Sequence, residues 1–137
     1  MVLYKSSIIS LDYNPASDIM EVLYPDLEGF MLPEIKNSLT LMVDTIRHYD
    51  VKKLLLDASK SMVAISEEEN KELMKKLAVD LANTRLQKVA RIQPVDPLRE
   101  IRAQQNIEGL RQEGLLPYQV KTFSSKLEAI DWLAAGN

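Results

Sequence analysis

The chain has 137 residues, the usual size of one domain, and we expect residues 1–137 to form a single folded unit. Its 17 basic and 20 acidic residues give a net charge of -3, which argues against wholesale electrostatic capture of nucleic acid. The absence of cysteine excludes disulfides, thiolate metal sites and cysteine nucleophiles, and it fits a reducing compartment.

The first predicted elements are two strands, 8–13 and 19–24, which are rich in β-branched and aromatic residues. Between them, residues 14–18 read Asn-Pro-Ala-Ser-Asp, a dense turn signal because Asn and Asp bond nearby backbone and Pro presets its φ angle. Pro25 ends the second strand, since it cannot donate to a ladder. We therefore predict a β-hairpin.

A helix is predicted from Pro33 to about Tyr49, because apolar residues recur there at helical spacing and proline suits a first helical position. The next strand lies within 52–59 and contains three consecutive leucines. Such a run is typical of a central parallel strand that is covered on both faces. Ser66 then opens a second helix through a capping box with Glu69.

Strand and helix alternate twice more toward the C-terminus. A strand at 87–93 precedes a helix that begins with Asp96 as its cap, and a strand at 117–123 precedes a helix opened by Ser125. The order ββαβαβαβα predicts an α/β fold with a mixed five-stranded sheet and about four helices. Its N-terminal antiparallel hairpin is followed by parallel βαβ crossovers.

Polar residues after the third predicted strand are the main site candidates. In open α/β sheets, ligands bind beyond the carboxyl ends of the strands. That rule selects Asp57, Ser59, Lys60 and Ser61, and Ser66 begins the helix that follows. Asp57 also has a simpler interpretation, in which its carboxylate caps the loop backbone or pairs with Lys60.

Two other features are candidates for binding. Arg91 is unusual in a strand expected to be covered, and it either contacts an anion, pairs with a carboxylate or extends its head to water. It belongs to a locally basic stretch, 85–111. Segment 29–32 is apolar for a loop, so Phe30 and Met31 are candidate docking residues unless they complete the core over a helix end.

Several kinds of site are not predicted. His48 is the one histidine, and it cannot build a zinc site or a catalytic triad alone. The four glycines form no phosphate-binding loop. Residues 1–7 do not resemble a secretory signal, and no stretch reaches the ~20 apolar residues of a membrane helix. We therefore predict a cytoplasmic protein with no cofactor, metal, catalytic residue or membrane insertion.

Three segments carry a family resemblance through their order and spacing: 54–59 with Ser66 after it, 88–92 and 120–133. Together they resemble a stand-alone bacterial member of the anti-sigma factor antagonist (STAS-like) family. The resemblance implies a STAS-like fold, shared at a distance with lipid-carrying CRAL-TRIO domains. It also implies a phosphorylatable serine near Ser66, although the Asp-Ser-x-Gly motif of regulatory members is absent here.

Three functional hypotheses follow. The first is a non-catalytic binding or regulatory module that acts through residues 57–66 on another protein or on a second copy in a homodimer. The second is a carrier of a small apolar or lipid-like ligand, with 30–32 as its gate. The third is an enzyme that uses Asp57, Lys60 and Arg91, and it requires these three side chains to converge on one pocket.

Overall fold

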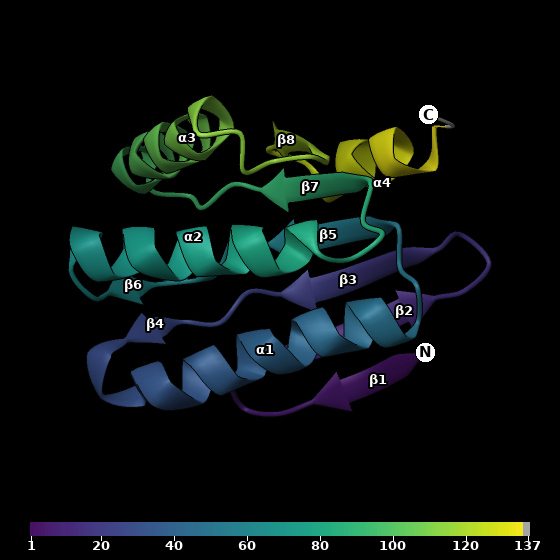
Figure 1. Cartoon of the computed structure of the whole chain (residues 1–137), viewed down its shortest axis with the longest axis horizontal. Helices are drawn as coiled ribbons and strands as arrows, with labels where there is room; N and C mark the ends of the chain where they lie inside the picture. Colours follow the sequence, from purple (N-terminus) through teal and green to yellow (C-terminus); the bar gives the residue numbers. More distant parts are fainter. Residues whose placement is uncertain (136–137) are drawn as a thin grey trace.

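The computed structural model describes residues 1–135, and its main feature is a mixed sheet. The strands of this sheet are β1 (Val2–Lys5), β2 (Ser10–Asn14), β3 (Ile19–Leu23), β5 (Lys53–Asp57), β7 (Lys88–Ile92) and β8 (Gln119–Phe123). They lie in the order β1-β2-β3-β5-β7-β8 (Figure 1). The first three pair antiparallel, whereas β3, β5, β7 and β8 run parallel, so the predicted hairpin and the parallel crossovers are confirmed.

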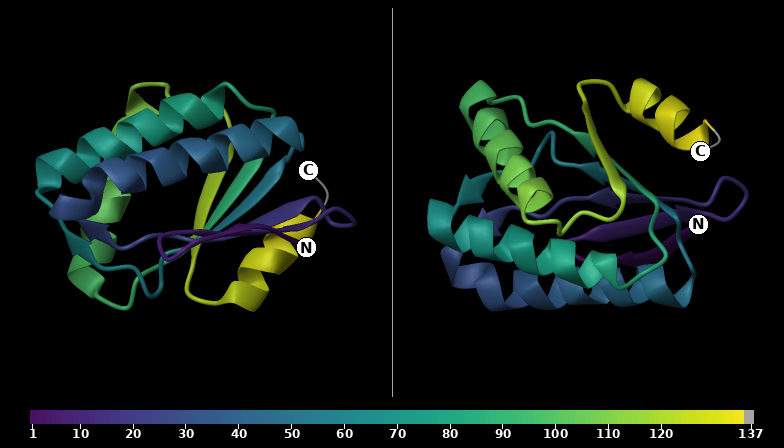
Figure 2. Two further views of the ribbon diagram at one scale, coloured as in Figure 1. Left: turned by 90° about the horizontal axis from the view of Figure 1, so that it is seen from below. Right: turned by 45° about the horizontal axis from the view of Figure 1, so that its top comes forward.

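Helices cover both faces of this sheet. They are α1 (Leu32–His48), preceded by the short 3-10 turn η1 (Gly29–Met31), α2 (Glu67–Ala82), α3 (Pro97–Gln112) and α4 (Lys126–Ala134). Figure 2 shows α1 and α2 on one side of the sheet and α4 on the other. Contacts from α3 to Arg91 and Thr122 place that helix on the same side as α1 and α2.

The three leucines of β5 explain why the sheet has two cores. Leu54 and Leu56 belong to the larger core with α1 and α2, while Leu55 belongs to the smaller core with α4. All three are buried. A strand that is covered on both faces gains no stability from alternating polarity, which is why the continuous apolar run correctly predicted a central parallel strand.

The structure has one strand more in this sheet than the five predicted. The additional strand, β1, lies at the sheet edge and pairs with β2 through an irregular register between Val2 and Tyr4. Its side chains are mostly exposed, with Val2 at 60%. An exposed, irregular edge strand needs no alternation of polar and apolar residues, so periodicity did not reveal it.

A second, two-stranded sheet holds the loop that follows β5. It consists of β4 (Leu27–Glu28) and β6 (Val63–Ala64), which pair in parallel. The buried Ser61 hydroxyl also donates to the Pro25 carbonyl at 2.7 Å, and the Met62 N–H donates to the Asp26 carboxylate at 2.8 Å. Residues 58–66, called the roof loop below, are therefore fixed to the segment that leaves β3.

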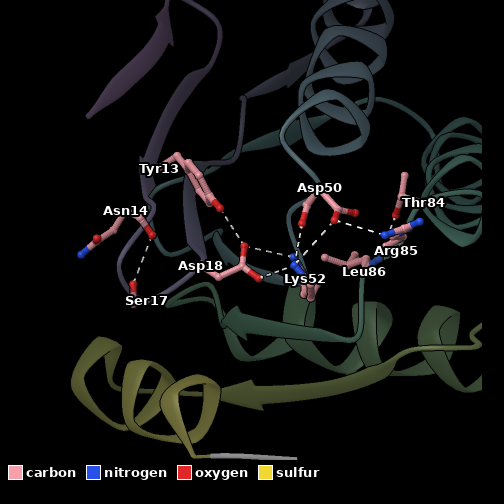
Figure 3. Close-up of polar contacts among 9 residues, drawn as sticks. All are labelled: Tyr13, Asn14, Ser17, Asp18, Asp50, Lys52, Thr84, Arg85 and Leu86. Carbon is pink, nitrogen blue, oxygen red and sulfur yellow. Dashed lines mark hydrogen bonds and ion pairs between the residues drawn. The ribbon is translucent and has the colours of Figure 1, made fainter.

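A polar network ties together the opposite end of the sheet (Figure 3). Asp18 adopts a φ of 58°, a conformation that aspartate tolerates in turns. Its carboxylate accepts a hydrogen bond from the Tyr13 hydroxyl at 2.8 Å and pairs with the Lys52 ammonium at 3.2 Å. Asp50 extends the network to Arg85 at 3.4 Å. At this end, the charged groups of the network compensate one another.

Candidate functional site

A cavity of about 220 Å³ lies between α2, α3 and the sheet. Its walls are mostly apolar, and several roof-loop residues cover it. In Figure 1 the arrowheads of β3 and β7 point toward the end of the molecule where β4 and β6 lie, so the roof loop is at the carboxyl end of the parallel strands. The residues that line the cavity include Leu56, Ala58, Ser61, Val63, Ile65, Met74, Leu77, Leu81, Val89, Ala103, Ile107, Leu110 and Leu116.

The cavity has a polar end and an apolar end. Ser66 and Glu67 come from the start of α2, and Arg99 and Arg102 from the first half of α3, so the charged groups lie toward the carboxyl ends of the strands. The later turns of both helices contribute leucine and isoleucine instead. An amphipathic molecule placed here would have its polar head among the arginines and its apolar part between the helices.

Arg91 is held by an ion pair at the side of this cavity. Its guanidinium donates two hydrogen bonds to Glu100 of α3, at 3.1 and 3.3 Å, and a third to Thr122 at 2.9 Å. The two charged side chains are only 12% and 14% exposed. Of the alternatives raised by the sequence, the structure therefore realises pairing with a carboxylate, and this pair links β7 to α3.

The other two arginines of the cavity differ in their partners. Arg102 pairs with Glu67 of α2 at 2.9 Å, in a contact with both side chains largely exposed. Arg99 takes part in no ion pair within residues 1–135, and its Nη1 donates to the Ser61 carbonyl of the roof loop. Its Nε is buried and has no hydrogen-bond partner. Arg99 therefore has a positive charge with no carboxylate partner within residues 1–135, and its Nε–H has no hydrogen-bond acceptor.

Asp57 at the end of β5 and the candidates in the roof loop have well-defined hydrogen bonds. Asp57 accepts hydrogen bonds from the Ser59 N–H at 3.0 Å and the Ser59 hydroxyl at 2.6 Å, so it caps the loop backbone. Ser61 is buried and lines the cavity. Ser66 caps α2 in the predicted capping box with Glu69, and it lies at the polar end of the cavity. The loop chosen from the sequence is therefore beside the cavity.

The three residues of the enzyme hypothesis do not converge. Arg91 stands opposite Leu56 in the register of β5 and β7, and it lines the cavity. Asp57 stands opposite Ile92, whose side chain packs in the core on the α4 face. Asp57 and Lys60 line a separate hollow of about 390 Å³ beside β2 and β4. Within residues 1–135, Arg91 therefore lines one hollow while Asp57 and Lys60 line another.

The remaining candidates separate into exposed and structural residues. Phe30 is 79% exposed, whereas Met31 is partly buried against the larger core. His48 ends α1 and contacts the Tyr49 ring edge-on. Within residues 1–135, no group of His, Cys, Asp or Glu side chains could hold a metal ion. In the same range, no helix is both long and apolar enough to cross a membrane.

Tyr24 is a partly buried tyrosine next to the cavity. It lines both the cavity and the separate hollow. Burial raises the pKa of its phenol to about 12, and the nearby Arg91 charge opposes that rise only in part. The phenol therefore remains neutral near pH 7, where it is a hydrogen-bond donor rather than a base.

Sequence reasoning missed Arg99 and Arg102 as residues of the site. Their spacing of three places both on one side of α3, and the basic stretch 85–111 contains them. Neither the spacing nor the basic stretch indicates which side of α3 faces the sheet. The exposed apolar residues Leu98 and Ile101 on the same helix obscure the buried face.

Comparison with known proteins supports the fold. No family model matches the chain, and no curated protein matches it. A solved structure that matches is an uncharacterized protein from the DUF3478 family with a SpoIIAA-like fold, from Shewanella loihica PV-4. It has a TM-score of 0.59 and 17% identity, over 95% of this chain and 99% of that chain. The chain therefore has a SpoIIAA-like fold, and the predicted STAS-like architecture is confirmed.

Proposed function

We propose that this chain, whose fold is SpoIIAA-like, is a non-catalytic binding module that holds a small apolar molecule in the cavity between α2 and α3. The observation that carries the proposal is the size and lining of the cavity. Small-molecule sites are concave and mostly apolar, with a few polar groups at defined positions. An apolar cavity of about 150 Å³ is enough to bind benzene, and the cavity described here measures about 220 Å³.

The surroundings of the cavity favour binding over catalysis. Its apolar walls would stabilise an apolar ligand by removing it from water. The polar groups near it are mostly engaged with one another, as in the Arg91–Glu100 pair and the capping box of Ser66. The Ser66 hydroxyl lies next to the Glu69 carboxylate, and both groups are engaged in the capping box of α2. The roof loop would act as the cover of the bound molecule.

The test is calorimetric titration and thermal unfolding of the full chain with octanol, a neutral probe with an apolar chain. When its free concentration is about 100 times its dissociation constant, a ligand that binds the folded state should raise Tm by roughly 5–10 °C in a domain of this size. Ala103→Leu should abolish this effect, because Ala103 lines the cavity and the larger side chain occupies it. Absence of binding to the wild type would refute the proposal.

A matched control is available on the opposite face of the sheet. Ala134 is an exposed helical alanine of α4, so Ala134→Leu makes the same chemical change far from the cavity. It should bind octanol like the wild type. If both leucine variants lost binding equally, the effect would not come from the cavity, and the proposal would fail.

A second candidate function is docking of another copy of this chain. Phe30 is 79% exposed and Met62 is 67% exposed, and they flank the two-stranded sheet of β4 and β6. Exposed apolar side chains of this size are common at contact surfaces. Sedimentation should then detect a dimer that Phe30→Ser dissociates, and a wild-type chain that stays monomeric at high concentration would remove this candidate.

A further inference from the structure

We infer that the ligand of the cavity carries one negative charge, a carboxylate at the end of an apolar chain, and that Arg99 binds this head group. The inference rests on the proposed function and adds to it the chemical class of the ligand. Three observations support the inference: the charges at the polar end of the cavity, the donors of Arg99 that lack an acceptor, and the apolar walls that lie next to them.

The charges at the polar end do not cancel. Arg91 is paired with Glu100, and Arg102 is paired with Glu67. Arg99 has no carboxylate partner within residues 1–135. One arginine charge is therefore left over at the cavity, and an anion that entered would find a cation that need not break an existing ion pair.

The hydrogen bonds of Arg99 lead to the same conclusion. A guanidinium has five N–H donors in a planar fork, which matches the two oxygens of a carboxylate. Here Nη1 uses the Ser61 carbonyl, while the buried Nε has no acceptor. Buried polar groups in native proteins are almost always hydrogen-bonded. Nε itself is enclosed, so a carboxylate ligand would bind the outer N–H groups of Arg99, for which the Ser61 carbonyl is the only hydrogen-bond acceptor within residues 1–135.

The starts of two helices add a favourable field for an anion. Ser66 and Glu67 lie at the N-terminal end of α2, and Arg99 lies in the first turn of α3. The N-terminal end of a helix carries partial positive charge, which stabilises an anion nearby. Because Arg91 and Arg102 already have carboxylate partners, one arginine charge remains for the head group. The site therefore matches a monoanion better than a phosphate dianion.

The apolar part of the ligand extends away from Arg99. The later turns of α2 and α3 contribute Leu81 and Leu110 to the walls, and Leu116 follows α3. The volume of about 220 Å³ exceeds that of cavities that hold a benzene molecule. A chain of the length found in octanoate is a suitable probe of this space, with its carboxylate at Arg99.

The test compares three probes that share one apolar chain: octanoate, octanol and octylamine. Binding to the full chain is measured by calorimetry, and the methyl NMR signal of Met74, which lines the cavity, reports occupancy. Octanoate should bind about 10-fold or more tightly than octanol, because a hydrogen-bonded charge pair is worth at least that factor. Octylamine should bind most weakly, because Arg99 repels it.

The variants separate Arg99 from its neighbours. Arg99→Gln should weaken octanoate binding about 10-fold and weaken octanol binding far less. Arg111→Gln is the matched control on the same helix, and it should leave octanoate affinity within about 3-fold, since Arg111 pairs with Glu108 and does not line the cavity. If Arg99→Gln did not fold, Arg99→Lys would keep the charge without the fork and should bind octanoate with intermediate affinity.

The possible failures are distinguishable. If octanol and octanoate bound equally and Arg99→Gln changed neither, the charge inference would be overturned while binding in the cavity would stand. If octanoate bound without shifting the Met74 signal, the head group would lie elsewhere and the inference would also be overturned. If none of the three probes bound, the proposed function itself would fail.

Discussion

The ion pair between Arg91 and Glu100 offers the sharpest test of how the cavity wall is held. Both side chains are more than four-fifths buried, and two hydrogen bonds of 3.1 and 3.3 Å join them. Removing one partner of a buried pair costs about 3–5 kcal/mol, because the other charge stays in a low-dielectric environment. Since this pair keeps a little solvent contact, we expect Glu100→Ala to lower the free energy of unfolding by about 3 kcal/mol.

Urea unfolding followed by circular dichroism measures this loss, and a variant that replaces both partners tests whether the unpaired charge causes it. Arg91→Met with Glu100→Leu replaces both charges by apolar groups of similar size, a change that is often nearly neutral. The double variant should therefore recover most of the stability that Glu100→Ala loses. A loss below about 1 kcal/mol for Glu100→Ala, or a double variant no more stable than the single one, would refute this account of the wall.

Three further predictions concern the ends of the sheet and the tyrosines. Ser66→Ala removes the capping box of α2 and should cost about 1 kcal/mol in urea unfolding. Asp18→Asn keeps a residue that tolerates the φ of 58° but loses the charge that faces Lys52, so it should cost up to about 1 kcal/mol, and less in high salt. Burial raises the pKa of Tyr118 to about 12. The unfolded phenol ionises near pH 10, so the contribution of Tyr118 is complete below pH 10 and should decline by about 1.4 kcal/mol per unit between pH 10 and 12, a decline that Tyr118→Phe should make shallower.

Much of the fold was predictable because local signals and tertiary structure agree. The turn at 14–18 joins β2 to β3 as expected, and Asp18 occupies the left-handed conformation that such turn residues tolerate. Ser66 and Asp96 cap their helices with the hydrogen bonds that their positions predicted. Each of these features depends on a few neighbouring residues, so the sequence alone contains the necessary information.

The elements that were missed depend on distant partners. β4 and β6 have two residues each, and they exist because Leu27 pairs with Val63 across 36 positions of sequence. No local periodicity can indicate so short a strand. β1 is similar, since its exposed residues acquire strand geometry only through pairing with β2. These segments become strands only because they pair with residues far away in the sequence, and the local sequence of one chain does not indicate such pairing.

The sequence led to the end of the sheet beside the cavity, but not to Arg99. The rule that ligands gather beyond the carboxyl ends of strands led to the roof loop, and its Ser61 and Ser66 do line the cavity. Arg99 was not selected, because its role depends on how α3 rotates over the sheet. Leu98 and Ile101, each 54% exposed, interrupt the apolar pattern that would have fixed that rotation. Helix orientation is a packing property, which spacing alone did not determine here.

The surroundings of Ser66 disfavour a phosphoryl group on its hydroxyl and are compatible with the proposed ligand in the cavity. Its hydroxyl accepts from the Glu69 N–H at 3.0 Å and lies 3.1 Å from the Glu69 carboxylate. A phosphoryl dianion there would meet the acidic first turn of α2, whose like charges repel it. A monoanion that binds Arg99 would satisfy a free donor without breaking the capping box. These contacts therefore fit the proposed binding of a ligand in the cavity better than phosphorylation of Ser66.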